Sequence, residues 1–116
     1  MLMSILFSVK NGLGIPEDDY YFDRTLIMHI NSVFSVLRQL GCGPVEGYEI
    51  SDSGNSWDEF IQNEPNKLQL VKTYMLMRVR QLFDPPLNGT VAQALERQTA
   101  EMEWRISTLC DPGEQP

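Results

Sequence analysis

Two consecutive prolines, Pro85 and Pro86, follow an amphipathic stretch that otherwise reads as one long helix. Proline cannot donate a backbone hydrogen bond, and its ring forces the preceding residue out of the helical conformation. A helix that reaches Phe83 must therefore end there, and the chain cannot continue straight through Asp84. We interpret residues 84–86 as a structural elbow between two helices and expect no catalytic chemistry at it.

The helix before the elbow, predicted from about Asn66 to Phe83, carries two apolar stripes. One consists of Leu68, Val71, Met75, Val79 and Leu82, and the other of Leu70, Tyr74 and Met77. At about 100° per residue the stripes point more than a right angle apart, so this helix is expected to bury two faces. It is therefore the predicted central element.

Two further long helices are predicted. The first has Asp23 as its candidate N-cap and Gly41 just past its C-terminus. Its apolar stripe consists of Leu26, Ile30, Val33, Phe34, Leu37 and Leu40. The last helix runs from about residue 90 to 109, and its apolar face consists of Val91, Leu95, Met102, Ile106 and Leu109.

Shorter elements precede and connect these helices. Residues 2–11 are expected to form a short helix, a candidate for docking late or on a partner. The stretch 42–56 has three glycines and one proline, which predicts an irregular loop and leaves a minor strand open. Ser56 and Glu59 have the spacing of a capping box, so a short helix is expected to begin at Trp57.

Together these elements predict an all-α fold, a small helical bundle of three long helices with a short N-terminal helix and a short connecting helix. A chain of 116 residues can build one core and is too short for two domains of usual size. Residues 1–110 are therefore expected to form a single domain. The tail at 111–116 is expected to be disordered.

The charge balance argues against one class of function. Sixteen acidic and nine basic residues give a net charge of −7, which repels phosphate and disfavours a surface that grips nucleic acid. The apolar opening "MLMSILFSV" lacks a basic segment and a cleavage site and is too short to cross a bilayer. We expect neither secretion nor membrane insertion.

The residues that catalysis normally needs are sparse. Cys42 and Cys110 have neither metal-binding nor CxxC spacing, which favours two free, packed thiols in a reduced compartment. The single histidine, His29, flanks an apolar stripe, where packing or a hydrogen bond is expected. Glu101 and Arg105 have the spacing of a surface ion pair. We therefore expect no enzyme activity, no cofactor and no metal site.

Trp104 points away from the apolar face of the last helix. Either the N-terminal segment covers it or another chain does. Tryptophan is enriched where interfaces concentrate their binding energy, so Trp104 is a candidate for a subunit or partner interface. The second stripe of the central helix, Leu70, Tyr74 and Met77, is a candidate for the same interface.

Three stretches occur in a characteristic order: "FDRTLIMHINSVFSVLRQLGCGP", "VKTYMLMRVRQLFDPPLNG" and "ERQTAEMEWRI", with a tryptophan between the first two. They span Phe22 to Ile106. In this order and spacing they resemble the small head-tail connector proteins of long-tailed bacteriophages, also called adaptor or head-completion proteins. No single stretch is diagnostic by its chemistry.

The resemblance implies a helical bundle whose copies form a ring, expected to be dodecameric, beneath the phage portal protein. Such a ring extends the DNA exit channel toward the tail, and the next neck or tail connector protein would be its other neighbour. The chain would be a virion structural protein of the neck, assembled in the bacterial host cytoplasm. Genomic DNA would pass without specific binding, which suits an acidic protein.

A second hypothesis, from another class, is a soluble helical interaction module, a monomer or dimer with no virion role. Its Met-rich and Trp-bearing surface would bind a partner helix. A small oligomer with no affinity for the portal protein would favour it. A ring instead needs two different, complementary surfaces on each subunit.

Overall fold

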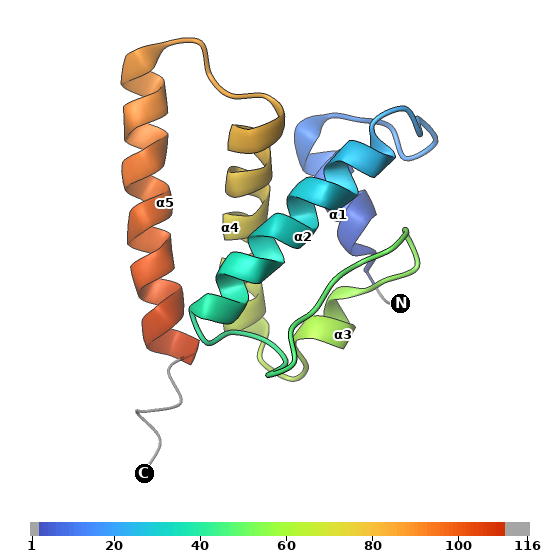
Figure 1. Ribbon diagram of the computed structural model, residues 1–116, viewed down its shortest axis with the longest axis vertical. Coiled ribbons are helices and arrows are strands. Elements are labelled where there is room, and N and C mark those ends of the chain that lie inside the picture. The colour runs from blue at the N-terminus through green and yellow to red at the C-terminus, as the bar shows by residue number, and fades with distance from the viewer. Residues whose placement is uncertain (1–2, 111–116) are drawn as a thin grey trace.

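The structure, a computed structural model, describes residues 3–110 (Figure 1). Its helices are α1 (Ile5–Leu13), α2 (Asp23–Gln39), α3 (Trp57–Phe60), α4 (Pro65–Phe83) and α5 (Gly89–Cys110). Over the described range the one strand-like pairing is an isolated bridge between Ser4 and Ser56. The predicted all-α class and the irregular stretch at 42–56 are therefore confirmed. The tail predicted to be disordered, 111–116, lies outside the described residues.

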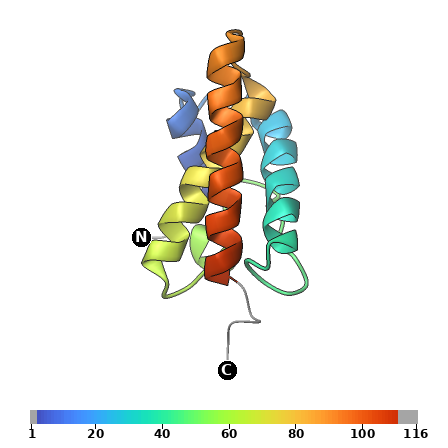
Figure 2. The ribbon, with the colours of Figure 1, turned by 90° about the vertical axis from the view of Figure 1, so that its left-hand side faces the viewer.

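Helix α4 is the centre of the bundle, as its two apolar stripes predict. It packs against α1 and α2 on one side and against α5 on the other (Figure 1, Figure 2). Val71, Met75 and Val79 of the first stripe are buried, and so is Tyr74 of the second. Both faces of α4 are thus covered within one chain.

The chain reverses direction between α4 and α5. Helix α4 ends at Phe83, as the two prolines predict, and the Asp84 amide still donates to the Arg80 carbonyl at 2.8 Å. Helix α5 begins at Gly89, where the Asn88 side-chain oxygen accepts hydrogen bonds from two amides of the first turn. The two helices consequently form an antiparallel hairpin (Figure 1).

Helix α1 belongs to the core. Ile5, Leu6 and Val9 are each at most 2% exposed, and the helix packs on α4 and α2. It ends at Gly14, whose φ of 78° suits a residue without a Cβ. The expectation that this segment docks on a partner is wrong, because its apolar face is already buried in its own chain.

The start of α2 differs from the prediction in its cap. Phe22 rather than Asp23 occupies the cap position, without a side-chain capping bond. The Asp23 carboxylate is instead 2.8 Å from the ammonium of Lys10, a side chain with no exposed area. The Asp23 carboxylate, which the sequence suggested as a helix cap, instead pairs with the buried ammonium of Lys10 from α1.

Helix α3 begins at Trp57, as predicted, but its capping box does not form. The Ser56 hydroxyl is buried and has no hydrogen-bond partner among the described residues. The Glu59 carboxylate accepts instead from the Tyr48 hydroxyl at 2.6 Å and the Asn55 amide at 3.0 Å. These hydrogen bonds, chiefly that of Tyr48, lower the pKa of Glu59. Glu59 therefore chiefly holds the 42–56 loop, and the Ser56 backbone N–H contributes least to the lowered pKa.

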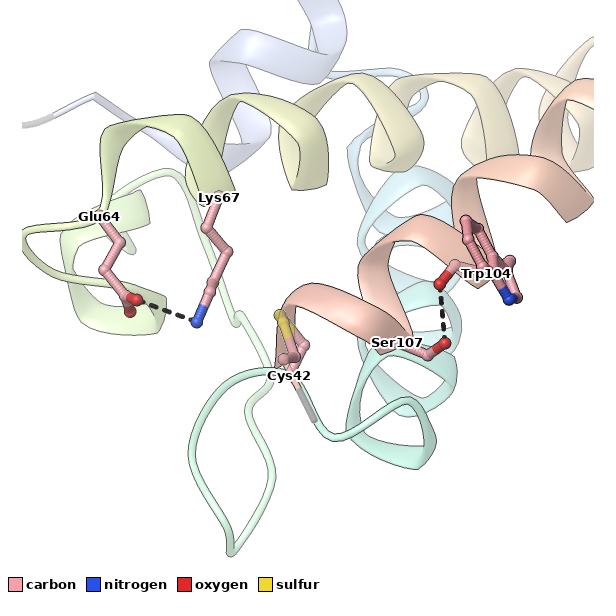
Figure 3. The surroundings of a disulfide bond; sticks show 6 residues. Cys42, Glu64, Lys67, Trp104 and Ser107 are labelled. Carbon is pink, nitrogen blue, oxygen red and sulfur yellow. Dashed lines mark hydrogen bonds and ion pairs between the residues drawn. A yellow bond between two sulfur atoms is a disulfide. The ribbon is translucent and has the colours of Figure 1, made fainter. Parts of the chain in front are cut away.

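Cys42 and Cys110 form a disulfide that ties the end of α5 to the turn after α2 (Figure 3). Their Cα atoms lie 5.1 Å apart although 68 positions separate them in the sequence. The prediction of two free thiols is wrong, because the antiparallel return of α5 brings its last residue back to this turn. Spacing along the chain carries no information about a pairing that only the fold creates.

Candidate interaction surface

Helix α5 is the least buried of the three long helices. Of its 22 residues only Thr99 and Ile106 are buried. Val91 and Leu109, which the sequence placed on the buried face, are 52% and 53% exposed, so that part of the prediction is wrong. The reason is that α5 packs chiefly on α4 and lies at the edge of the bundle (Figure 2). Much of its surface is therefore open to a partner.

Trp104 is the largest exposed side chain on α5, with 69% of its area accessible (Figure 3). It precedes the buried Ile106 by two residues, so it points about 200° around the helix from the core side. Helix α1 packs on α4 and α2 instead of reaching Trp104. Of the two alternatives that the sequence left open, coverage by the N-terminal segment is thus excluded for residues 3–110.

The other candidate interface residues lie on α4. Leu70 and Met77 are half-buried, whereas Tyr74 has no exposed area. Because α5 covers the second stripe of α4, Tyr74 offers no surface to a partner. Leu70 and Met77 keep part of their surface accessible, but Trp104 is the most exposed of the candidates.

Tyr74 joins the two helices through a polar contact. Its hydroxyl donates to the Glu103 carboxylate at 2.6 Å, and the Arg78 guanidinium lies 4.0 Å from the same oxygen. Burial, together with this hydrogen bond and the negative charge of Glu103, raises the pKa of Tyr74 well above its ordinary value. The hydroxyl stays protonated and keeps α5 attached to α4.

We expect Tyr74→Phe to lower the free energy of unfolding by about 1–2 kcal/mol, because it leaves the half-buried Glu103 carboxylate short of a donor. An unfolded tyrosine ionises near pH 10, below the folded pKa, so wild-type stability should fall as pH rises above about 10. The variant should lose less over that range. Urea unfolding at neutral and alkaline pH measures both effects. Tyr20→Phe, at a 71% exposed site, is the matched control and should change neither.

A hollow of about 440 Å³ lies on one flank of the α4–α5 hairpin. We call it the flank groove, and its lining residues are Asn66, Gln69, Leu70, Thr73, Met102 and Arg105. Gln69 and Thr73 also line a smaller adjoining hollow that contains Lys72 and reaches α1. No carboxylate lines either hollow, although the chain carries a net charge of −7. The flank groove is thus a locally cationic, partly apolar surface.

Arg105 is available to that groove. The sequence predicts an ion pair between Glu101 and Arg105, but no salt bridge joins them among the ion pairs of the described residues. Both side chains are exposed. The i, i+4 spacing of this pair indicates only a solvated surface. Arg105 becomes a lining residue because α4 lies beside α5.

Six of the sixteen acidic residues lie in one segment on a different part of the molecule. Between Gln39 and Asn66 the sequence has six acidic residues and no lysine or arginine. All six are exposed: Glu46, Glu49, Asp52, Asp58, Glu59 and Glu64. This acidic segment, residues 42–64, lies in the half of the molecule away from the α4–α5 turn (Figure 1). Charge is therefore distributed unevenly over the surface.

The single histidine and the potential metal ligands lie apart within the described residues. His29 is half-buried, and no group of three or more potential metal ligands gathers within residues 3–110. In the same range, no helix combines the length and apolarity needed to span a bilayer. The features that stand out are surfaces for contact: the outer face of α5 and the flank groove.

Comparison with known proteins agrees with an assembly role. No curated protein and no solved structure matches the chain. A family model described as "Phage connector protein" matches residues 5–113, which is nearly the whole chain. The match includes all five helices and the Cys42–Cys110 pair, and it confirms the resemblance that the three sequence stretches carry. The chain belongs to the phage connector protein family.

Proposed function

We propose that this connector is a head-tail connector subunit whose copies form a ring beneath the portal protein and extend the DNA exit channel toward the tail. The observation that carries the proposal is the uncovered outer face of α5. A helix of 22 residues that buries two side chains, and displays Trp104 at 69% exposure, is incompletely packed in the single chain. Packing between copies would cover it.

The proposed role is structural and not enzymatic. The portal protein would contact one rim of the ring and the next neck or tail connector the other, which places the chain in the virion neck after assembly in the host cytoplasm. A dodecameric ring is the expected form. Support comes from the family and from the exposed outer face of α5.

The acidic segment supports the proposed relation to DNA. Six exposed carboxylates, of which only Glu64 pairs with a lysine or arginine among the described residues, repel phosphate. If this segment lines the channel, the genome can slide past it without being held. We therefore propose that DNA passes through the ring and is not bound by it.

The proposal is tested by the mass of the purified chain in solution, measured by light scattering after size exclusion, alone and with the portal protein from the same genome. The expected result is a ring-sized species, or a monomer that assembles on the portal in ring stoichiometry. The assembled sample should not shift duplex DNA in electrophoresis at physiological salt. A monomer or dimer indifferent to the portal would refute the ring and favour the helical interaction module.

A further inference from the structure

We propose that Trp104 of one copy inserts into the flank groove of the next copy, and that repetition of this contact closes the ring. This inference rests on the connector role proposed above and names the two surfaces through which copies meet. The occupant of the groove is a second copy of the chain, because each copy displays both halves of the contact on different sides of α5.

The flank groove has the chemistry to receive an indole ring. Leu70 and Met102 give it apolar surface, and a volume of about 440 Å³ leaves room for a tryptophan side chain. A methionine sulfur and an arginine guanidinium both interact favourably with aromatic rings, and Arg105 supplies the guanidinium. An aromatic anchor that fills such a hollow is the usual centre of a protein interface.

Charge makes the two halves complementary. Glu101 lies one helical turn before Trp104 on the exposed side of α5, and within residues 3–110 it belongs to no ion pair. The groove carries Arg105, and its adjoining hollow carries Lys72, without a carboxylate between them. Glu101 also lies four residues before Arg105 of its own chain, at the border between anchor and groove. Seating Trp104 therefore brings Glu101 of one copy toward Arg105 and Lys72 of the next, a contact between opposite charges.

The positions of the two halves suit a closed ring. Around the axis of α5, Trp104 points about 130° away from the direction midway between Met102 and Arg105. One copy therefore cannot fill its own groove with its own Trp104. In sequence Trp104 lies between those two lining residues, which places both halves at the same height along α5. With α5 parallel to the ring axis, such a head-to-tail contact adds rotation with almost no rise, and rotation without rise closes a ring instead of a filament.

The decisive experiment uses two variants at exposed positions, Trp104→Ala and Thr73→Glu, each studied with the portal protein present. Trp104→Ala lacks the anchor but keeps the groove, whereas Thr73→Glu places a carboxylate in the groove but keeps the anchor. Each variant alone should lose ring assembly. An equimolar mixture, with one variant carrying an affinity tag, should give one-to-one pairs that grow no further, because only one intact contact remains.

A charge exchange provides a second readout. Glu101→Arg and Arg105→Glu should each weaken assembly at least tenfold, and the chain that carries both changes should recover it, since the opposite charges again meet across the contact. Tyr21→Ala removes another aromatic side chain, 84% exposed, and should leave assembly unchanged. Circular dichroism confirms that each variant remains helical.

The outcomes separate this inference from the proposed function. A wild-type chain that stays small with the portal protein overturns both. If the wild type forms rings and Trp104→Ala forms them equally completely, the proposed Trp104 contact is refuted and the connector role remains. Failure of the mixed variants to pair, when each is folded and the wild type assembles, also overturns the head-to-tail contact.

Discussion

Reduction of the Cys42–Cys110 disulfide is expected to lower the free energy of unfolding by about 4 kcal/mol. The bond joins positions 68 residues apart, and a cross-link over so long a loop removes much conformational entropy from the unfolded chain. It also holds the end of α5, a helix that buries only Thr99 and Ile106 along its own length. A loss of this size is a large share of the stability of a small domain.

Urea unfolding of the oxidised chain, the reduced chain and the double variant Cys42→Ala/Cys110→Ala measures this contribution. The reduced chain and the double variant should unfold at similar, lower urea concentrations, and reductant should not affect the double variant. The variant thus separates the bond from other effects of the reductant. Equal midpoints for oxidised and reduced chains would show that the bond contributes no stability.

Assembly in the host cytoplasm, as proposed above, predicts when the disulfide forms. Bacterial cytoplasm keeps thiols reduced, so we expect the chain to assemble with Cys42 and Cys110 as thiols. The bond should close after release, when an oxidant such as dissolved oxygen takes two electrons and two protons from the pair. Alkylation followed by mass spectrometry, on chain from intact cells and from released particles, distinguishes the two states. Oxidised chain inside the cell would contradict this order.

The helices were predictable from the sequence because their signals are local. Apolar spacing placed the three long helices, and the prolines at 85 and 86 ended α4 at Phe83. The errors concern side chains whose partners lie far away in the sequence. Glu59 matches a local capping box, yet Tyr48 and Asn55 compete for its carboxylate once the loop folds. Local patterns determine where helices form, but tertiary contacts decide what a polar group binds.

The candidate surface was predictable only in part, for a related reason. Trp104 could be found from sequence because its angle from Ile106 follows from helix geometry alone. The flank groove could not, since Leu70 and Arg105 come together only when α4 and α5 pack side by side. For the same reason Tyr74 resembled an interface residue until its contact with Glu103 placed it inside the hairpin. A protruding side chain can be predicted from the sequence of one helix, whereas a groove forms only where two helices pack together.

Replacement of Lys10 is the second change expected to have a large effect on stability. Lys10 is a charged side chain with no exposed area, and it lies at the junction of α1, the following loop and α2. Its ammonium donates to the carbonyls of Glu17 and Asp19 at 3.1 and 2.8 Å and to the Asp23 carboxylate at 2.8 Å. All three of its hydrogens are therefore used. The Tyr20 ring, 5.5 Å from the ammonium, adds a cation–π contact.

We expect Lys10→Met to lower the free energy of unfolding by about 3 kcal/mol, because it keeps the aliphatic stem but leaves the Asp23 carboxylate, mostly buried, without its cation. Thermal and urea unfolding measure the loss. Lys67→Met is the matched control: Lys67 pairs with Glu64 at the surface, so its removal should cost less than about 1 kcal/mol.

A double variant shows whether the unpaired carboxylate is the cause. Lys10→Met/Asp23→Leu removes both charges, so its cost should be smaller than the sum of the two single costs. Strict additivity would mean that Lys10 acts through the loop carbonyls and not through Asp23. A Lys10→Met variant as stable as Lys67→Met would mean that water replaces the ammonium freely. The coupling therefore measures how firmly α1 is anchored to α2.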